Sequence, residues 1–166
     1  MRTAIILLTA LLLLATATAS FAGDHRTFGL GFVLGEPTGI SAKYFLADPH
    51  ALDFDLAFSF LDEYLLFGTD YLYHFNDVLP NASVVLMRPY IGGGGVVAFD
   101  FDTNNDKGIG HDHNNDFGLE ARFTAGLSWL FTTVPLETFI DISPGIWLIP
   151  ETNADFSGVI GLRYFF

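Results

Sequence analysis

The chain has 166 residues, no cysteine and a formal net charge of −12. The acidic balance argues against nucleic acid, which requires a basic face, and against simple electrostatic docking on anionic lipid. Charged residues make up 16% of the chain and aromatic residues another 16%. A water-facing surface normally carries about a quarter to a third charged residues. The composition therefore predicts a protein with too few charges to cover a soluble globule.

Residues 1–22 are predicted to be a secretory signal peptide. A short positive start, Met1-Arg2, precedes an apolar core at residues 5–14, and Ser20-Phe21-Ala22 follows with small residues at the positions that a signal peptidase reads. The core is shorter than the ~20 residues of a spanning helix. We expect cleavage after Ala22 and a single mature domain over residues 23–166. Without cysteines, this domain has no disulfides to stabilise it.

The mature chain has a hydrophobic period of two. Apolar residues alternate with polar or small ones, as in 117–129, where successive strand side chains point to opposite faces. The pattern predicts eight strands, at 27–35, 38–46, 51–60, 64–75, 84–101, 116–131, 136–149 and 155–166. Beyond the leader, no apolar run approaches the ~18 residues of a transmembrane helix. Since a closed barrel is the other structure that can span a bilayer, we predict an all-β, eight-stranded antiparallel up-and-down transmembrane β-barrel.

Irregular strand geometry is predicted at three places. The run of glycines at 92–95 predicts a bend or bulge in its strand. Pro89 and Pro144 lie inside predicted strands, and each is expected to mark a bulge or a lost ladder hydrogen bond.

Aromatic residues gather near the predicted strand ends and indicate two girdles at the membrane interfaces. One girdle lies where the even-numbered strands end: Tyr44, Tyr73, Phe75, Trp129, Phe131, Tyr164 and Phe166. The other lies where the odd-numbered strands end: Phe32, Phe58, Phe60, Phe99, Phe101 and Trp147. The longest connection, 102–115, is on the odd-numbered side, which is the external side if the rule of short periplasmic turns holds.

The last six residues, Gly161-Leu162-Arg163-Tyr164-Phe165-Phe166, form a pattern of Gly, two residues, an aromatic residue, one residue and a terminal aromatic residue. This pattern resembles the carboxy-terminal β-signal of bacterial outer-membrane barrels, carried here by Gly161, Tyr164 and Phe166. With the leader and the strands, the mature chain is similar to small eight-stranded outer-membrane β-barrel proteins. The resemblance implies export, a Gram-negative-type outer membrane, surrounding lipid, and recognition by the barrel-assembly machinery. It implies no reaction.

The polar faces of the strands carry the candidate functional residues. They are Lys43, Asp53, Asp55, Asp70, His74, Arg88, Glu120, Arg122, Glu137, Asp141 and Arg163. If the apolar faces meet lipid, these side chains point into the lumen. An eight-stranded barrel is only just wide enough for side chains to fill it. We therefore expect a packed network in which every buried charge has a partner, with a proton or ion path as the alternative.

The polar residues raise two possible kinds of chemistry, a lipid-modifying enzyme and a metal site. No His is followed by Ser two residues later, as the lipid A deacylase resemblance would require, and no Ser nucleophile is placed beside His74 and Asp70, so we predict no enzyme. In the 102–115 loop, Asp102, Asn104 and Asp106 follow the start of a calcium-loop pattern, and His111 and His113 are possible zinc ligands. A solvated acidic loop without a metal is the expectation, so we predict no cofactor, with a divalent cation at this loop as the alternative.

The sequence predicts an outer-membrane barrel with a structural or surface-interaction role, a packed charged lumen and the 102–115 loop as its contact surface for a ligand. The first alternative is a narrow pore or lateral route for small solutes. The second is a secreted lipocalin-like binding barrel with its apolar face inside, because alternation alone does not choose the inside.

Overall fold

The computed structural model describes residues 27–59, 64–80, 82–100 and 117–166. Its strands are β1 (Phe28–Glu36), β2 (Thr38–Ala47), β3 (His50–Phe58), β4 (Tyr64–His74), β5 (Val85–Asp100), β6 (Phe117–Phe131), β7 (Leu136–Ile149) and β8 (Asn153–Phe165). Each differs from its predicted range by at most two residues at either end. Within the described ranges, no helix is long and apolar enough to cross a membrane.

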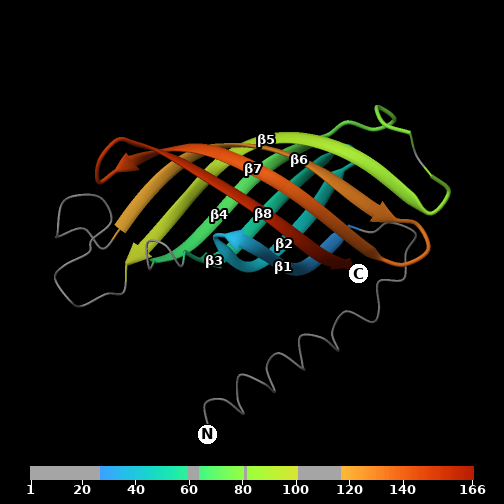
Figure 1. Cartoon of the computed structure of the whole chain (residues 1–166), viewed down its shortest axis with the longest axis horizontal. Coiled ribbons are helices and arrows are strands. Elements are labelled where there is room, and N and C mark those ends of the chain that lie inside the picture. The colour runs from blue at the N-terminus through green and yellow to red at the C-terminus, as the bar shows by residue number, and fades with distance from the viewer. Residues whose placement is uncertain (1–26, 60–63, 81, 101–116) are drawn as a thin grey trace, which may run out of the picture.

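The eight strands close into one antiparallel barrel in chain order, which confirms the predicted fold class (Figure 1). The closing pair runs in continuous register from Gly29 opposite Phe165 to Glu36 opposite Gly158. The amide of Phe166 then donates to the carbonyl of Phe28 at 2.9 Å, and their rings stack at 6.3 Å. The last residues of the chain therefore complete the barrel.

The two ends of the barrel have different connections. The end that we call the terminal end holds Thr27 and Phe166, together with the turns after β2, β4 and β6. The opposite end, here the loop end, holds the turn at Pro37 and the turn between β7 and β8. Figure 1 shows the strands tilted strongly between these ends.

A bend or bulge was predicted at residues 92–95, and the strand has no bulge there. All four glycines pair in unbroken register with β4 on one side and β6 on the other. The observed register shifts lie between Phe45 and Ala47 and between Leu119 and Glu120. Glycine has no Cβ to obstruct the neighbouring side chains. Within this regular strand, Leu72 packs beside Gly92 and Asp70 beside Gly94, where a Cβ would overlap them.

Both prolines occupy positions without a bulge. Pro89 pairs with Leu127 in the regular β5–β6 register, and its carbonyl accepts from the amide of Phe75 just beyond β4. At Pro144, the β6–β7 pairing is interrupted between Arg122–Gly145 and Ala125–Ile142 without a change of register. Since proline has no N–H to donate, a missing ladder bond at each site follows directly.

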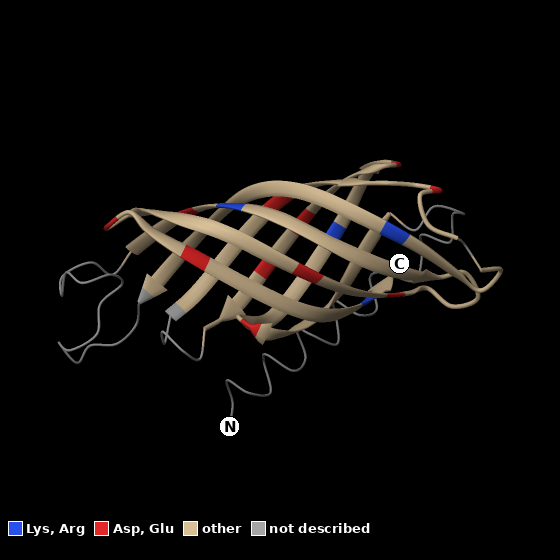
Figure 2. Ribbon diagram, turned by 45° about the horizontal axis from the view of Figure 1, so that its top comes forward, with Lys and Arg blue, Asp and Glu red and all other residues tan. Residues whose placement is uncertain are grey.

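The outer surface of the barrel is apolar. Large hydrophobic side chains are exposed on every strand, among them Leu34 on β1, Ile40 on β2, Phe67 on β4, Ile142 on β7 and Ile160 on β8. The alternate residues point inward, and the buried charged side chains Lys43, Asp53, Asp70, Glu120, Glu137 and Arg163 are among them. Figure 2 marks the charged residues along the strands. The molecule therefore has its apolar face outside and its charges inside.

The exposed aromatic residues agree with most of the two predicted girdles. Tyr44, Tyr73 and Tyr164 are exposed near the terminal end, and Phe32, Phe58 and Phe99 near the loop end. Phe60 and Phe101 lie outside the described residues. Trp147 does not belong to a girdle: it is 8% exposed and packs inside against Ala57, Leu66, Val96 and Ala98. Trp147 is on the inward face of β7, in phase with Ser143 and Gly145.

Candidate functional site in the barrel lumen

The structure places the predicted polar residues on the inward side of the barrel wall. Seven are buried: Lys43, Asp53, Asp70, His74, Glu120, Glu137 and Arg163. Four are half-buried: Asp55, Arg88, Arg122 and Asp141. Most of them gather into two groups, which we call the Arg163 cluster and the Arg122 cluster.

The Arg163 cluster joins four strands near the terminal end. The Arg163 guanidinium on β8 donates to both carboxylate oxygens of Asp53 on β3 at 2.8 and 2.7 Å, and to Glu137 on β7 at 3.4 Å. The ammonium of Lys43 on β2 donates to the other oxygen of Glu137 at 2.9 Å. Because all four side chains are almost fully buried, each charge depends on these partners for the solvation that water would otherwise supply.

Aromatic rings enclose the Arg163 cluster. The Arg163 guanidinium carbon lies 3.8 Å from the ring centroid of Phe139, and the Lys43 ammonium lies 5.0 Å from that of Tyr90. Phe45 and Phe165 pack together at 5.9 Å on the same side. Cation–π contacts of this kind strengthen when they are desolvated. Charged and aromatic side chains together fill the lumen at the terminal end.

His74 belongs to this group and does not pair with Asp70. Its Nε2 lies 3.4 Å from the Lys43 ammonium, and its Nδ1 lies 3.3 Å from the carbonyl oxygen of Pro49. Asp70, the other candidate of the triad hypothesis, bonds instead to Arg122. His74 and Asp70 therefore have separate partners.

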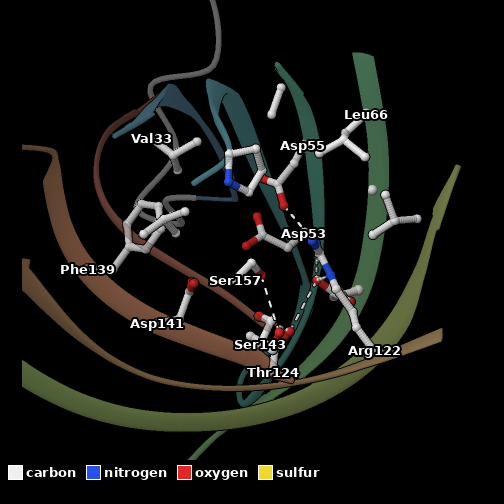
Figure 3. A pocket seen from close by; sticks show the side chains of 16 residues that line it. Val33, Asp53, Asp55, Leu66, Arg122, Thr124, Phe139, Asp141, Ser143 and Ser157 are labelled. Atoms are coloured by element: carbon white, nitrogen blue, oxygen red, sulfur yellow. Dashed lines mark hydrogen bonds and ion pairs between the residues drawn. The ribbon is translucent and has the colours of Figure 1, made fainter. Parts of the chain in front are cut away.

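The Arg122 cluster lies nearer the middle of the barrel (Figure 3). Arg122 on β6 donates through Nε and Nη2 to Asp70 on β4 at 2.9 and 2.5 Å, and through Nη2 to Asp55 on β3 at 2.9 Å. Thr124 adds a hydrogen bond to Ser143 at 2.9 Å. One guanidinium thus binds two carboxylates from the opposite wall, in the fork geometry that arginine provides.

Several uncharged partners in the lumen were not predicted. The hydroxyl of Tyr90 donates to Asp141 at 2.9 Å, and Ser41 accepts from Arg163 Nε at 3.2 Å. Alternation could have found them, since Tyr90 shares a strand face with Arg88 and Ser41 with Lys43. A search confined to charged residues overlooks hydroxyl groups that complete a buried network.

Arg88 lies apart from both clusters. Its Nη1 is 3.5 Å from Asp48 in the turn after β2, and the Arg88 and Asp48 side chains are 20% and 56% exposed. Asn76 also donates to Asp48, at 3.0 Å. This group is at the terminal rim and faces solvent.

Inward-facing glycines make room for the large side chains. A Cβ at Gly161 would overlap the Phe139 ring, and a Cβ at Gly126 would overlap the Tyr90 ring. A Cβ at Gly68 would lie 2.9 Å from Arg122 Nη2. The barrel therefore contains these large side chains because the facing positions have no side chain.

The lumen also contains cavities, and two of them are lined by described residues. One of about 30 Å³ lies among Asp53, Asp55, Arg122 and Asp141 (Figure 3), which is room for about one or two water molecules. The other, of about 100 Å³, lies toward the loop end and is lined by residues that include Glu120 and Trp147. The lumen is thus filled at the terminal end and hollow toward the loop end.

The predicted metal ligands Asp102, Asn104, Asp106, His111 and His113 lie outside the described residues. Among the residues that the structure does describe, no group of three or more His, Asp or Glu side chains is placed to hold a metal ion.

The residues of the predicted assembly signal lie on or beside the closing strand β8. Gly161 packs against Phe139, Tyr164 faces outward at 48% exposure, and Phe166 pairs with Phe28. Each has a structural contact in the finished barrel.

Comparison of the chain with protein-family models, with curated proteins and with solved structures found no match.

Proposed function

We propose that the chain is an integral outer-membrane β-barrel protein of a Gram-negative-type bacterium, with a structural or surface-interaction role and a lumen closed by its own side chains. The observation that carries the proposal is the distribution of side chains across the barrel wall. Leu34, Phe67, Ile142 and Ile160 are each about half exposed on the outside, while Lys43 and Arg163 are almost completely buried inside. This distribution suits a hydrocarbon environment and is unfavourable in water.

The closure of the sheet supports the same proposal. In lipid, every backbone polar group requires an internal partner, and a closed barrel leaves no strand edge. The continuous β1–β8 register, extended to Phe166, provides that closure. In this proposal residues 1–22 direct export, and Gly161, Tyr164 and Phe166 are read by the assembly machinery. The 102–115 loop, outside the described residues, is the proposed contact surface for a ligand at the cell surface.

The two alternatives are less well supported. A pore needs a continuous passage, whereas the Arg163 cluster and its aromatic rings fill the lumen at the terminal end. A lipocalin-like barrel needs an apolar interior, whereas the buried positions here include Lys43, Asp53, Asp70, Glu137 and Arg163.

Cell fractionation followed by a heat-modifiability gel tests the proposal. The full chain, with residues 1–22, is expressed in a Gram-negative host, and outer membranes are compared with periplasm, with unboiled and boiled samples side by side. We expect the protein in the outer-membrane fraction and a faster-migrating band in the unboiled sample, because a closed barrel resists unfolding by detergent. Recovery as a soluble periplasmic protein without a mobility shift would refute the proposal.

A further inference from the structure

The β7–β8 hairpin extends past the neighbouring strand β1 at the loop end of the barrel. The pairing of β8 with β1 ends at Gly158 opposite Glu36, whereas the pairing of β8 with β7 continues to Asn153. After Glu36 the chain turns at Pro37 and enters β2, so no described strand continues β1 alongside residues 153–157. Figure 1 shows the β7–β8 turn lying well beyond the β1–β2 turn. The barrel is closed as far as Gly158, and past that residue β8 has a free edge.

The free edge presents backbone groups of Ala154 and Phe156. On the same strand, the amide of Phe166 donates toward β1, and the amide of Phe165 donates to the carbonyl of Pro135 just before β7. The backbone groups of a strand alternate between its two neighbours, so the N–H and C=O groups of the even-numbered residues point toward β1. No described residue pairs with Ala154 or Phe156 on that side. Their N–H and C=O groups therefore face the open side of the hairpin.

The free edge lacks most of the features that prevent strand pairing. Natural proteins block such edges with prolines, bulges or charged side chains, most often lysine. Residues 153–157 contain no proline, lysine or arginine, and their register with β7 is regular. The outward side chain of Phe156 is 65% exposed. The edge is therefore open to a further strand, and Phe156 offers an apolar contact to a side chain on that strand.

The projecting part of the hairpin carries negative charge. Residues 145–157 include Glu151, which is exposed, and Asp155, which is half-buried, and they include no basic residue. The whole chain has a formal net charge of −12. A strand with basic side chains would therefore meet a field of the opposite sign, whereas an acidic strand would be repelled.

A second copy of the chain is a poor occupant of this edge. In the proposed function all copies have the same orientation in one membrane, so two facing β8 strands would be related by an axis along the membrane normal. Because the strands of such barrels tilt by about 35–45°, two strands related in this way would cross at a wide angle and could not pair. An open edge is also admissible only outside the hydrocarbon. The edge is therefore accessible to a partner from the aqueous side.

We propose that the free edge of β8 binds an extended, basic peptide segment of another protein, which adds a strand to the sheet. Main-chain hydrogen bonds to Ala154 and Phe156 provide affinity in this mode of recognition, and alternate side chains provide specificity. The proposal deepens the surface-interaction role of the proposed function and rests on it for the orientation of the copies. It gives that role a contact surface formed by described residues.

A binding titration of the folded barrel in nonionic detergent tests the proposal. The probe is a short fluorescein-labelled peptide of alternating valine and lysine, whose fluorescence anisotropy is followed as the barrel is added. We expect saturable binding, and at least about tenfold weaker binding to Ala154→Pro, because this variant loses one donor of the free edge. Since that N–H points away from β7, the variant retains the β7–β8 ladder. Ala154→Val is the matched control, because it keeps the N–H, and it should bind within about twofold of the parent.

Two further peptides separate strand pairing from general attraction. The first has the same sequence with every backbone nitrogen methylated, which removes the N–H donors and keeps the charge. The second alternates valine with glutamate, which keeps the donors and reverses the charge. Both should bind at least about tenfold more weakly than the valine–lysine peptide.

Amide hydrogen exchange on the unsubstituted barrel provides an independent measurement, which also serves if Ala154→Pro does not fold. The Phe156 amide should exchange rapidly in the free barrel, and at least about tenfold more slowly when the peptide is saturating. The Ser157 amide, which points toward β7 opposite Ser143, is the internal reference and should not change.

Four results would overturn the proposal. The first is the absence of saturable binding, and the second is equal binding of the methylated peptide, which would indicate attraction without strand pairing. The third is equal binding of the glutamate peptide, which would exclude a basic partner. The fourth is a protected Phe156 amide without peptide, which would show that the edge is already occupied, by a second copy if the barrel is then a dimer. None of these results affects the outer-membrane proposal, because fractionation tests that independently.

Discussion

At the scale of single residues, the lumen resolves a conflict that the strand register creates. Asp53 and Asp70 are directly paired across β3 and β4, and like charges in such positions repel each other. Arg163 from β8 binds Asp53, and Arg122 from β6 binds Asp70. Two arginines from the opposite wall therefore convert a repulsive pair into two salt bridges that brace the barrel across its interior.

Replacing Arg163 should strongly destabilise the barrel. Arg163→Met removes the cation that binds Asp53 and one of the two cations that bind Glu137, and both carboxylates are buried. We expect a loss of about 3–5 kcal/mol in the free energy of unfolding. Urea unfolding of the protein in lipid vesicles measures this difference. Asp53→Asn in the Arg163→Met background should recover part of the loss, because the unpaired charge is then removed.

Arg88→Met is the control for that change. Its partner Asp48 is 56% exposed and the pair is 3.5 Å apart, so the variant should lose less than about 1 kcal/mol. If both arginine variants were destabilised to the same small extent, the Arg163 cluster would not brace the barrel as described.

At the scale of elements, the closing strand β8 combines two roles. Gly161 makes room for the Phe139 ring of β7, while the amide of Phe166 donates a hydrogen bond to the carbonyl of Phe28 on β1. The same residues belong to the proposed assembly signal. Packing and recognition by the assembly machinery make different predictions for substitutions in this strand.

Gly161→Ala should destabilise the purified barrel by about 1–3 kcal/mol, because its Cβ would overlap the Phe139 ring and force the packing to shift. Phe139→Leu in the same chain should recover part of this loss. Urea unfolding after refolding in vesicles measures the packing effect without any assembly machinery. A variant of normal stability in vesicles that accumulates poorly in outer membranes would assign Gly161 to recognition and not to packing.

At the scale of the whole molecule, the apolar exterior is the feature on which the proposed lipid environment rests. Ile142 lies in the middle of β7 with 49% of its surface exposed, and Val78 lies in the turn after β4 with 63% exposed. A protein in water would tolerate arginine at either position. A protein in a bilayer would tolerate it only at the second.

Ile142→Arg should therefore lose about 2–4 kcal/mol of unfolding free energy in lipid vesicles, and Val78→Arg about 0–1 kcal/mol. The comparison needs no knowledge of the ligand, because both substitutions add the same side chain to an exposed site. Equal and small losses would argue for a barrel that does not cross the bilayer at Ile142.

The filled lumen leads to a second expectation at this scale. The barrel reconstituted in a planar bilayer should give no stable ohmic conductance steps, since Arg163, Lys43 and the surrounding rings fill the terminal end. Reproducible steps from the purified protein, absent from a mock preparation, would favour the pore alternative.

The sequence alone was sufficient to predict where the strands lie, how many there are and which residues share each of their two faces. Alternation is a property of the local backbone, so Lys43, Asp53 and Glu137 could be assigned to one kind of face without knowledge of any partner strand. The bulge predicted at residues 92–95 was wrong because the function of a glycine depends on its neighbours: Gly94 makes room for Asp70 and Gly92 for Leu72. Trp147 was misplaced because its apolar character outweighed its phase on the strand.

Only the tertiary structure decided which charges meet. Arg163 and Asp53 lie 110 residues apart in the chain, and their contact depends on closure, strand tilt and register across the lumen. The position of Glu120 also depends on tertiary structure. Its side chain lies over Gly145 because of how β6 and β8 align with β7. The period of two is local and can be read from one strand. A partner across the barrel depends on all eight strands at once, because one residue of slip would turn every side chain of a strand to the other face.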